Sequence, residues 1–309
     1  FLKIFSIQSK LSILEKQIDP DVVVTTSGPS YWHSDRPHLM GYNLPLYIYQ
    51  ESPYFRILTP YRRFRLLLKK QLHFFFFRRD ANAYIVQTDD VNKRLRKSIG
   101  TEKVYTVSNT YNSYFVNPVK LADKLPERTS ANEVRFLTLT SYYRHKDIEI
   151  IPKICRNLLA LGFLNFRFVV TLAENEFHKV FGHELDNHIT NVGPVRPDEC
   201  PSLYMESDFL FLPTLAECFS AAYPEAMIME KPIITTRLGF ATDICRDAAA
   251  YYEPMDADSA TDVILKLIND SQQQRQLIQN GKRRVKDFHT APERARMIID
   301  ICSRLADQK

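Results

Sequence analysis

Two glutamates, Glu217 and Glu225, lie in a stretch whose residue types suit a ligand with both phosphate and hydroxyl groups. The apolar run Phe209–Leu212 is followed by a short loop with Glu217, a helical pattern with Glu225, and a second apolar run at Ile233–Ile234. Strand, loop, helix and strand in this order predict a βαβ unit. N–H groups at the helix start can bind phosphate, and carboxylates can accept hydrogen bonds from paired hydroxyls. A proline inside a helix is costly, so Pro224 predicts that this helix begins late or bends.

A basic loop follows an earlier apolar run. Arg144 and Lys146 come directly after the expected strand at 134–139. Cations at the carboxyl end of a strand in an α/β sheet suit an anionic ligand. The alternative is that both are solvated charges at the end of a helix.

The stretch around the two glutamates resembles the Glu-x7-Glu signature of retaining GT-B glycosyltransferases, the family that includes glycogen and sucrose-phosphate synthases and many bacterial polysaccharide transferases. The matching segments are Glu217-Cys-Phe-Ser220, Glu225-Ala-Met227 and Lys231-Pro-Ile-Ile234. The two glycines of the family pattern are replaced by Cys218 and Ser220. These replacements change how closely the backbone can approach a phosphate.

The resemblance implies a role for each residue of a donor site. Glu225 would bind the ribose hydroxyls of a nucleotide, and Glu217 would contact the transferred sugar and steady positive charge at its anomeric carbon. Lys146 and Arg144 would bind the departing diphosphate, which is electrostatic catalysis without a metal. The remaining donor-binding residues implied are Ser220, Ala221, Phe219, Ser141, Gly193 and Val195. Gly193 is equally compatible with turn chemistry alone.

The first half of the chain supplies candidates for contacts with an acceptor. The family has a His after a strand that corresponds to Pro45–Tyr49, and here that expected strand leads into Gln50 and Glu51. An aromatic loop at 28–42 adds further candidates, and Tyr31, Trp32 and His33 could form a platform for stacking against a sugar. The acceptor-side candidates are Trp32, His33, His38, Gln50 and Glu51. An ordinary loop position is the alternative for each.

Residues 54–79 form a basic, aromatic helical region. Arginines and lysines alternate with Phe, Leu and Tyr, and no Asp or Glu occurs before Asp80. A helix of this kind is typical of binding to an anionic membrane surface, which would favour a lipid-linked acceptor. The alternative is a helix that packs on the sheet with its charges solvated.

The composition excludes several classes of protein. The chain of 309 residues is 45% hydrophobic and 25% charged, with a net charge of +5, a mild basic bias that is no nucleic-acid signature. Five scattered cysteines favour reduced thiols in the cytoplasm over disulfides or zinc. No apolar run approaches the about 18 residues of a membrane span. Asp256-Ala-Asp258 precedes a helical pattern, so it predicts a helix cap and no metal site.

Apolar runs alternate with helical patterns along the chain. Strands are expected at 21–26, 46–49, 84–86, 104–107, 134–139, 166–172, 188–192, 209–212 and 233–234. Helices are expected at 2–18, 54–79, 89–99, 148–161, 174–184, 198–205, 258–268, 271–288 and 292–305. This alternation predicts doubly wound parallel sheets.

The fold class expected is α/β and GT-B-like, with two Rossmann-like domains that face a cleft. Residues 1–120 would form the acceptor-side domain, 121–133 a linker, 134–290 the domain that binds the nucleotide sugar, and 291–309 a helix that returns to the first domain. The first domain begins inside a helical pattern, without the opening strand and Gly-rich loop of the family. At least one βα unit is therefore expected to precede Phe1.

The residues and the resemblance together predict a metal-independent retaining glycosyltransferase, without a cofactor, that moves a sugar from a nucleotide-diphosphate sugar to a glycan or lipid-linked acceptor. Surface polysaccharide or glycolipid synthesis is the expected setting, at the inner face of a membrane. The alternatives are a GT-B-fold nucleotide-sugar epimerase or phosphorylase, or a degenerate non-enzymatic partner subunit. A nucleic-acid-binding protein would need clustered stacking residues, which the chain lacks.

Overall fold

A computed structural model describes residues 2–121, 124–182, 185 and 187–307. The chain folds into two compact units. Unit 1 comprises Phe1–Asn109, Glu217–Phe219 and His289–Lys309, and unit 2 comprises Thr110–Ala216 and Ser220–Phe288. The predicted linker and the predicted last helix each include two residues outside the described ones, 122–123 and 308–309. The predicted domain boundaries stay a prediction.

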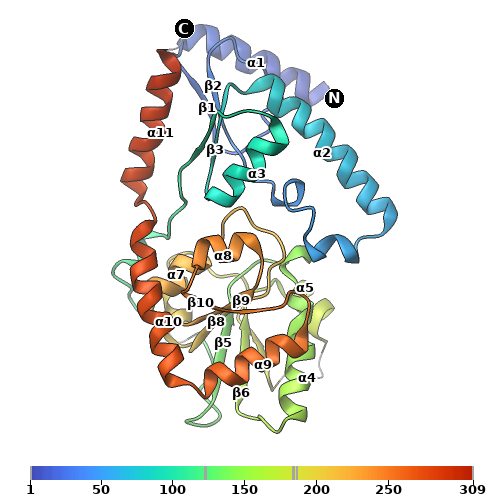
Figure 1. Ribbon diagram of the computed structural model, residues 1–309, viewed down its shortest axis with the longest axis vertical. Helices are drawn as coiled ribbons and strands as arrows, with labels where there is room; N and C mark the ends of the chain where they lie inside the picture. Colours follow the sequence, from blue (N-terminus) through green and yellow to red (C-terminus); the bar gives the residue numbers. More distant parts are fainter. Residues whose placement is uncertain (1, 122–123, 183–184, 186, 308–309) are drawn as a thin grey trace. The chain divides into compact units, whose positions relative to one another are not determined.

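Unit 1 is built on a sheet of four parallel strands in the order β1-β2-β3-β4 (Figure 1). The strands are β1 (Val23–Thr25), β2 (His38–Gly41), β3 (Ala83–Val86) and β4 (Val104–Thr106). The helices are α1 (Leu2–Ile18), α2 (Pro60–Asp80), α3 (Asp89–Ile99) and α11 (Ala291–Ala306). Helix α11 packs on this sheet, because Ile301 and Leu305 share a core cluster with Leu39 and Ala83.

One predicted strand of unit 1 is wrong. Pro45–Tyr47 forms a 3-10 turn instead, in which the N–H of Ile48 donates to the carbonyl of Pro45. Proline lacks the N–H that a central strand needs but fits the first position of a helical turn. The structure instead has the strand β2, which lies in the segment expected to be a loop. Gly41 permits it, since a Cβ at this position would lie 2.0 Å from the carbonyl oxygen of Thr26.

The predicted helical region 54–79 consists of two elements. A 3-10 helix at Pro53–Ile57 comes first, and α2 then begins at Pro60 after Thr59, whose side chain accepts a hydrogen bond from the N–H of Arg62. Thr-Pro is a typical helix start. No helix in the described ranges is long and apolar enough to cross a membrane.

Unit 2 contains a sheet of six parallel strands in the order β10-β9-β8-β5-β6-β7. The strands are β5 (Val134–Thr138), β6 (Phe166–Val170), β7 (Ile189–Asn191), β8 (Phe209–Leu212), β9 (Ile233–Thr236) and β10 (Ala249–Tyr252). The helices are α4 (Ile151–Ala160), α5 (Glu174–Phe181), α6 (Cys200–Met205), α7 (Ala222–Ile228), α8 (Gly239–Cys245), α9 (Ala257–Ile268) and α10 (Ser271–Arg284). Helix α5 was predicted to end at 184, which lies outside the described residues. Helix α8 and strand β10 were not predicted.

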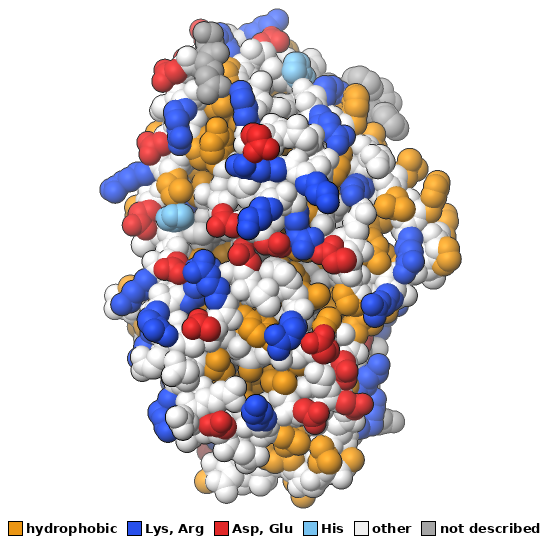
Figure 2. All heavy atoms as spheres, in the orientation of Figure 1, with side chains coloured by type: hydrophobic (Ala, Val, Ile, Leu, Met, Phe, Trp, Pro, Cys, Tyr) orange, Lys and Arg blue, Asp and Glu red, His pale blue; other side chains and the backbone are white. Residues whose placement is uncertain are grey.

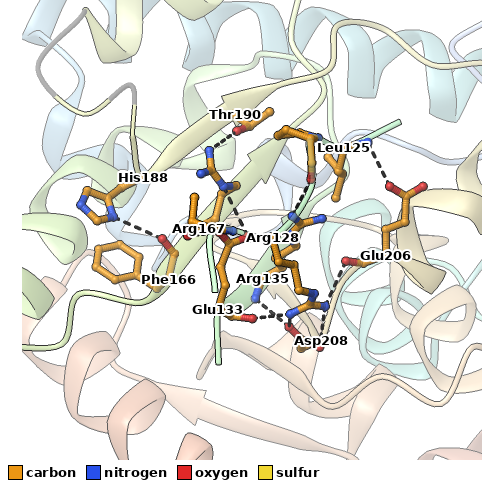
Figure 3. Close-up of polar contacts among 12 residues, drawn as sticks. Leu125, Arg128, Glu133, Arg135, Phe166, Arg167, His188, Thr190, Glu206 and Asp208 are labelled. Carbon is orange, nitrogen blue, oxygen red and sulfur yellow. Dashed lines mark hydrogen bonds and ion pairs between the residues drawn. The ribbon is translucent and has the colours of Figure 1, made fainter. Parts of the chain in front are cut away.

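Charged side chains occupy the amino-terminal ends of β5, β6 and β8, and those at β5 and β6 are buried (Figure 3). Arg135 and Arg167 lie directly opposite each other on β5 and β6, and the carboxylate of Glu133 lies 2.7 Å from Nε of Arg135 and 3.5 Å from Nε of Arg167. Thr129 donates two further hydrogen bonds to Glu133. The site described below lies at the other end of these strands, after their carboxyl ends. The buried charges therefore support the sheet that carries this site.

Candidate functional site

The strand order of unit 2 reverses between β5 and β8. These strands pair in parallel, with Phe136 opposite Phe209, and β6 continues the sheet on one side while β9 continues it on the other. The loops that leave the carboxyl ends of β5 and β8 therefore diverge. Ligands of open α/β sheets bind at such a switch point.

The loops after β5 and β8 are hydrogen-bonded to each other. The N–H of Leu215 donates to the carbonyl of His145 at 2.7 Å, and the hydroxyl of Thr214 lies 3.4 Å from the same oxygen. Burial, with the charge of Lys146 beside it, lowers the pKa of His145 to about 4, so this imidazole is neutral near pH 7. The basic loop is thus fixed to the glutamate-bearing loop through its backbone.

The predicted cations lie in a 3-10 turn, Arg144–Lys146, at this switch point. The N–H of Lys146 donates to the carbonyl of Tyr143 at 2.8 Å. Lys146 is half-buried, whereas Arg144 and Ser141 are exposed. The next residue, Asp147, has a left-handed φ of 51°, a conformation that Gly, Asn and Asp adopt more readily than other residues. The role of Arg144 and Lys146 at the diphosphate stays a prediction.

Glu225 lies in the first turn of α7. Pro224 is the third residue of this helix, where its missing N–H breaks no intrahelical bond, so the helix begins late, as predicted. The buried hydroxyl of Tyr204 on α6 lies 3.4 Å from Oε2 of Glu225 and 3.2 Å from the carbonyl oxygen of Ala222. Tyr204 therefore orients the carboxylate. The sequence contains no signal for this pairing, because Tyr204 is one apolar position among others in its helix.

Burial raises the pKa of Glu225 to about 7, and the hydrogen bond from Tyr204 lowers it in part. We therefore expect the affinity for a nucleotide sugar to fall as the pH drops below about 7, since only the ionised carboxylate accepts hydrogen bonds from both ribose hydroxyls. The diphosphate of a nucleotide sugar keeps its charge over this range. Titration calorimetry at about pH 6 and about pH 8 measures the change.

The control for this pH dependence is Glu225→Gln, which should bind weakly and equally at both pH values. If the wild type bound with equal affinity at both pH values, this would contradict the predicted contact of Glu225 with the ribose hydroxyls. The stability of the ligand-free protein changes with pH in the opposite direction. Because the pKa of Glu225 in the folded protein lies above the ordinary 4.5, the stability falls as the pH rises from 4.5 to about 7.

The remaining signature residues lead into α7. Ser220 and Ala221 directly precede this helix and are half-buried, and the side chain of Ala221 cannot cap it. Glu217 is 9% exposed and belongs to unit 1 together with Cys218 and Phe219, whereas Glu225 belongs to unit 2. That the two glutamates share one site stays a prediction.

The loop that contains the donor-binding candidates Gly193 and Val195 follows β7, the edge strand of the sheet. Gly193 has a φ of 72°, and its N–H donates to the side-chain oxygen of Asn191 at 3.3 Å. A left-handed turn of this kind favours glycine, so the turn chemistry is confirmed. Contact of Gly193 and Val195 with a nucleotide-sugar donor stays a prediction.

Two acceptor-side candidates lie elsewhere than expected. Trp32 is 7% exposed and donates from Nε1 to the hydroxyl of Ser12 on α1, so its flat face is not available for stacking against a sugar. The predicted platform is wrong for this residue. His38 is fully buried in β2, with Nε2 2.8 Å from the hydroxyl of Thr25, and is not a loop residue. His33 is exposed, and its Nδ1 lies 4.0 Å from Asp80.

Gln50 and Glu51 are exposed beside a surface hollow of unit 1. The carboxylate of Glu51 forms an ion pair with Arg94 at 2.5 Å, and Arg94 also bonds Asp90. These two candidates remain accessible for an acceptor.

The acidic motif at 256–258 is a helix cap, as predicted. Asp256 accepts hydrogen bonds from the N–H groups of Asp258 and Ser259 at the start of α9. Within the described ranges, no group of three or more His, Cys, Asp and Glu side chains could hold a metal ion.

Comparisons with known proteins identify the family and the fold of the chain. The model of the family "Glycosyl transferases group 1" matches residues 124–284, which is more than half of the 309 residues. A stretch of 104 residues is 32% identical to an uncharacterized glycosyltransferase of Methanocaldococcus jannaschii, and it covers 33% of this chain and 30% of that protein. The match thus spans less than a third of this relative.

Several solved structures share the fold. Sucrose-phosphate synthase of Thermosynechococcus elongatus aligns with a TM-score of 0.70 at 17% identity, over 89% of this chain and 69% of that chain. A glycosyltransferase of Rickettsia africae aligns with a TM-score of 0.71 at 15% identity, over 99% and 82%. HepE of Anabaena, in complex with UDP-glucose, aligns with a TM-score of 0.62 at 14% identity, over 88% and 72%.

The fold class predicted from the sequence, α/β and GT-B-like, is therefore confirmed. The chain belongs to the group 1 glycosyl transferases.

Proposed function

We propose that the protein is a retaining glycosyltransferase that moves a sugar from a nucleotide-diphosphate sugar to a glycan or lipid-linked acceptor in surface polysaccharide or glycolipid synthesis. The observation that carries the proposal is the position of the basic loop and of Glu225 around the switch point of the six-stranded sheet. The matched family and the UDP-glucose complex of the structurally similar HepE support a nucleotide sugar as the donor.

In the proposed reaction the bond between the anomeric carbon and the diphosphate breaks, and an acceptor oxygen bonds to that carbon as its proton passes to an oxygen of the departing diphosphate. Lys146 and Arg144 would stabilise the negative charge that builds on the departing diphosphate, so fixed protein cations take the place of a metal. Glu225, oriented by Tyr204, would hold the ribose. Glu217 would stabilise the positive charge on the sugar.

A thermal-shift screen of UDP, GDP, ADP, CMP and dTDP sugars tests the donor site. A ligand at 100 times its Kd should stabilise the wild type by about 2.7 kcal/mol, and Glu225→Ala should abolish this shift. The matched control is Glu230→Ala, which removes an exposed carboxylate from the segment that follows α7. A shift that survives in Glu225→Ala would refute the assigned site. Incubation with the donor alone distinguishes a transferase from an epimerase, which would convert the sugar without an acceptor.

We further propose that helix α2 binds an anionic membrane surface and places the protein on the inner face of a membrane. Apolar side chains that are 53–67% exposed recur at helical spacing along α2: Tyr61, Phe64, Leu68, Leu72 and Phe75. The buried side chains of the helix lie on the other side: His73, Phe74, Phe77 and Asp80. Figure 2 shows hydrophobic side chains next to Lys and Arg along the edge that α2 forms in this view. An exposed apolar strip flanked by basic residues fits the boundary of an anionic bilayer.

Co-sedimentation with lipid vesicles tests this membrane surface. The protein should bind vesicles that contain phosphatidylglycerol and bind pure phosphatidylcholine more weakly, and Phe64→Ser/Leu68→Ser should reduce binding by about tenfold or more. Leu161→Ser is the control, because Leu161 is 64% exposed but belongs to unit 2. Equal binding to both vesicle types, or an equal loss in the control, would contradict the proposal.

A further inference from the structure

A hollow of about 310 Å³ lies next to the first turns of α2 in unit 1. Its lining combines the acceptor-side candidates Gln50 and Glu51 with Phe55, Arg56 and, from α2, Arg63 and Leu67. This volume is at the lower end of the range of small-molecule sites. It suits a compact polar group together with a few carbon atoms.

The arginines of the hollow are positioned by the local fold. Nε of Arg63 donates to the carbonyl of Phe55 at 2.6 Å, which holds the guanidinium of α2 against the preceding 3-10 helix. The two Nη atoms carry four further N–H donors in the planar arrangement that suits phosphate. Arg56 lies on the exposed side of the same 3-10 helix. Two arginines thus face one hollow from two elements.

The net charge of the hollow is positive. Among the described residues that line it, Glu51 carries the one negative charge, and Arg94 pairs with this carboxylate at 2.5 Å. Arg94 is in turn bonded to Asp90 at 2.9 Å. The charges of Arg56 and Arg63 are therefore the ones left to attract a ligand, which must be anionic.

The hollow adjoins the exposed apolar strip of α2. Leu67 lines the hollow and is an i, i+3 neighbour of Phe64 on the helix, and Leu68 continues the strip. A second hollow of about 470 Å³ lies along the same helix. It is lined by basic side chains and by leucines, one of which is Leu72. A soluble sugar phosphate would leave these apolar side chains uncovered, whereas a lipid phosphate would cover them.

We propose that the hollow at Arg56 and Arg63 binds the phosphate group of a lipid-linked acceptor whose hydrocarbon chain lies along Phe64 and Leu68. The inference rests on the proposed glycosyl transfer and narrows its acceptor to the lipid-phosphate class. Gln50 and Glu51 line the same hollow, so the sugar attached to the phosphate would contact these two side chains first.

The test uses the full chain in neutral detergent micelles, with hexadecyl phosphate, hexadecanol and inorganic phosphate as probes for titration calorimetry. Hexadecyl phosphate should bind the wild type, and Arg56→Gln/Arg63→Gln should weaken this binding by about tenfold or more, since both charge-assisted contacts are lost. Lys97→Gln, which removes one positive charge from α3 of the same unit outside both hollows, should change it by less than about twofold. The single variant Arg56→Gln keeps the Arg63 bond to Phe55, so it separates phosphate recognition from local folding.

Each alternative outcome is decisive. Equally tight binding of hexadecanol would overturn recognition of the phosphate. Inorganic phosphate that binds as tightly as hexadecyl phosphate would assign the hollow to a soluble ligand. An equal loss in Lys97→Gln would reduce the effect to general charge attraction. The nucleotide-sugar shift, measured on the same preparation, separates the two proposals: a normal shift without lipid-phosphate binding overturns only the acceptor class, and binding without the shift overturns only the donor function.

Discussion

Glu133→Ala is expected to lower the free energy of unfolding by about 3–5 kcal/mol, because it leaves two buried guanidinium groups without their carboxylate. The side chains of Glu133, Arg135 and Arg167 are 1%, 4% and 9% exposed. Arg135 and Arg167 are direct neighbours across β5 and β6, where like charges repel. Denaturation by urea at neutral pH measures the loss.

The pH dependence of this loss follows from the pKa of Glu133. Burial alone would raise that pKa, but the hydrogen bonds from Thr129 and Arg135 and the charge of Arg167 outweigh it and lower the pKa to about 2. A carboxyl group with a lowered folded pKa stabilises the protein above its ordinary value of 4.5, and this stabilisation disappears as the pH falls toward 2. The difference between wild type and variant should therefore shrink over this range.

Glu102→Ala is the matched control for the buried carboxylate. Glu102 also pairs with an arginine, Arg96, at 2.6 Å, but its side chain is 85% exposed. A solvated pair of this kind contributes about 0–1 kcal/mol. If the two variants lost similar stability, the buried charges would have no special role in supporting the sheet.

Elements with local signals at both ends were predicted well from the sequence. Helix α3 spans Asp89–Ile99 as expected, because Thr88 caps its start and Gly100, with a φ of 80°, ends it. The strands β5, β6 and β8 coincide with continuous apolar runs, which are typical of strands buried on both faces of a parallel sheet. The basic loop and Glu217 were expected after the carboxyl ends of strands because each follows such a run.

Several of the errors arise because the structure of a segment depends on distant residues. The burial of Trp32 depends on Ser12, and the strand β2 depends on the close approach of Gly41 to Thr26. Short runs such as Ala249–Tyr252 have too few large side chains to predict a strand by themselves. The pairing of Glu225 with Tyr204 likewise requires two helices to be packed before it can be seen.

Lys146→Ala is expected to lower kcat by about 10²–10³-fold, since in the proposed reaction it removes a fixed cation that stabilises the charge on the departing diphosphate. Lys146 is half-buried in a turn that is hydrogen-bonded to the loop after β8, so its charge is less screened than that of the exposed Arg144. Arg144→Ala should consequently have the smaller effect. Initial rates of nucleotide release from the donor identified by thermal shift, with water as the acceptor, measure both variants.

Lys153→Ala controls for the loss of one positive charge, because Lys153 is exposed on α4, the helix that follows the same loop. A rise in KM at constant kcat in Lys146→Ala would mean that the lysine binds donor and transition state equally, which would refute a catalytic role. Lys146→Arg should restore part of the rate, as a cation at this position is what the proposed step requires. Rescue by arginine together with a silent Lys153→Ala would place the stabilising charge at the switch point, where β5 and β8 diverge.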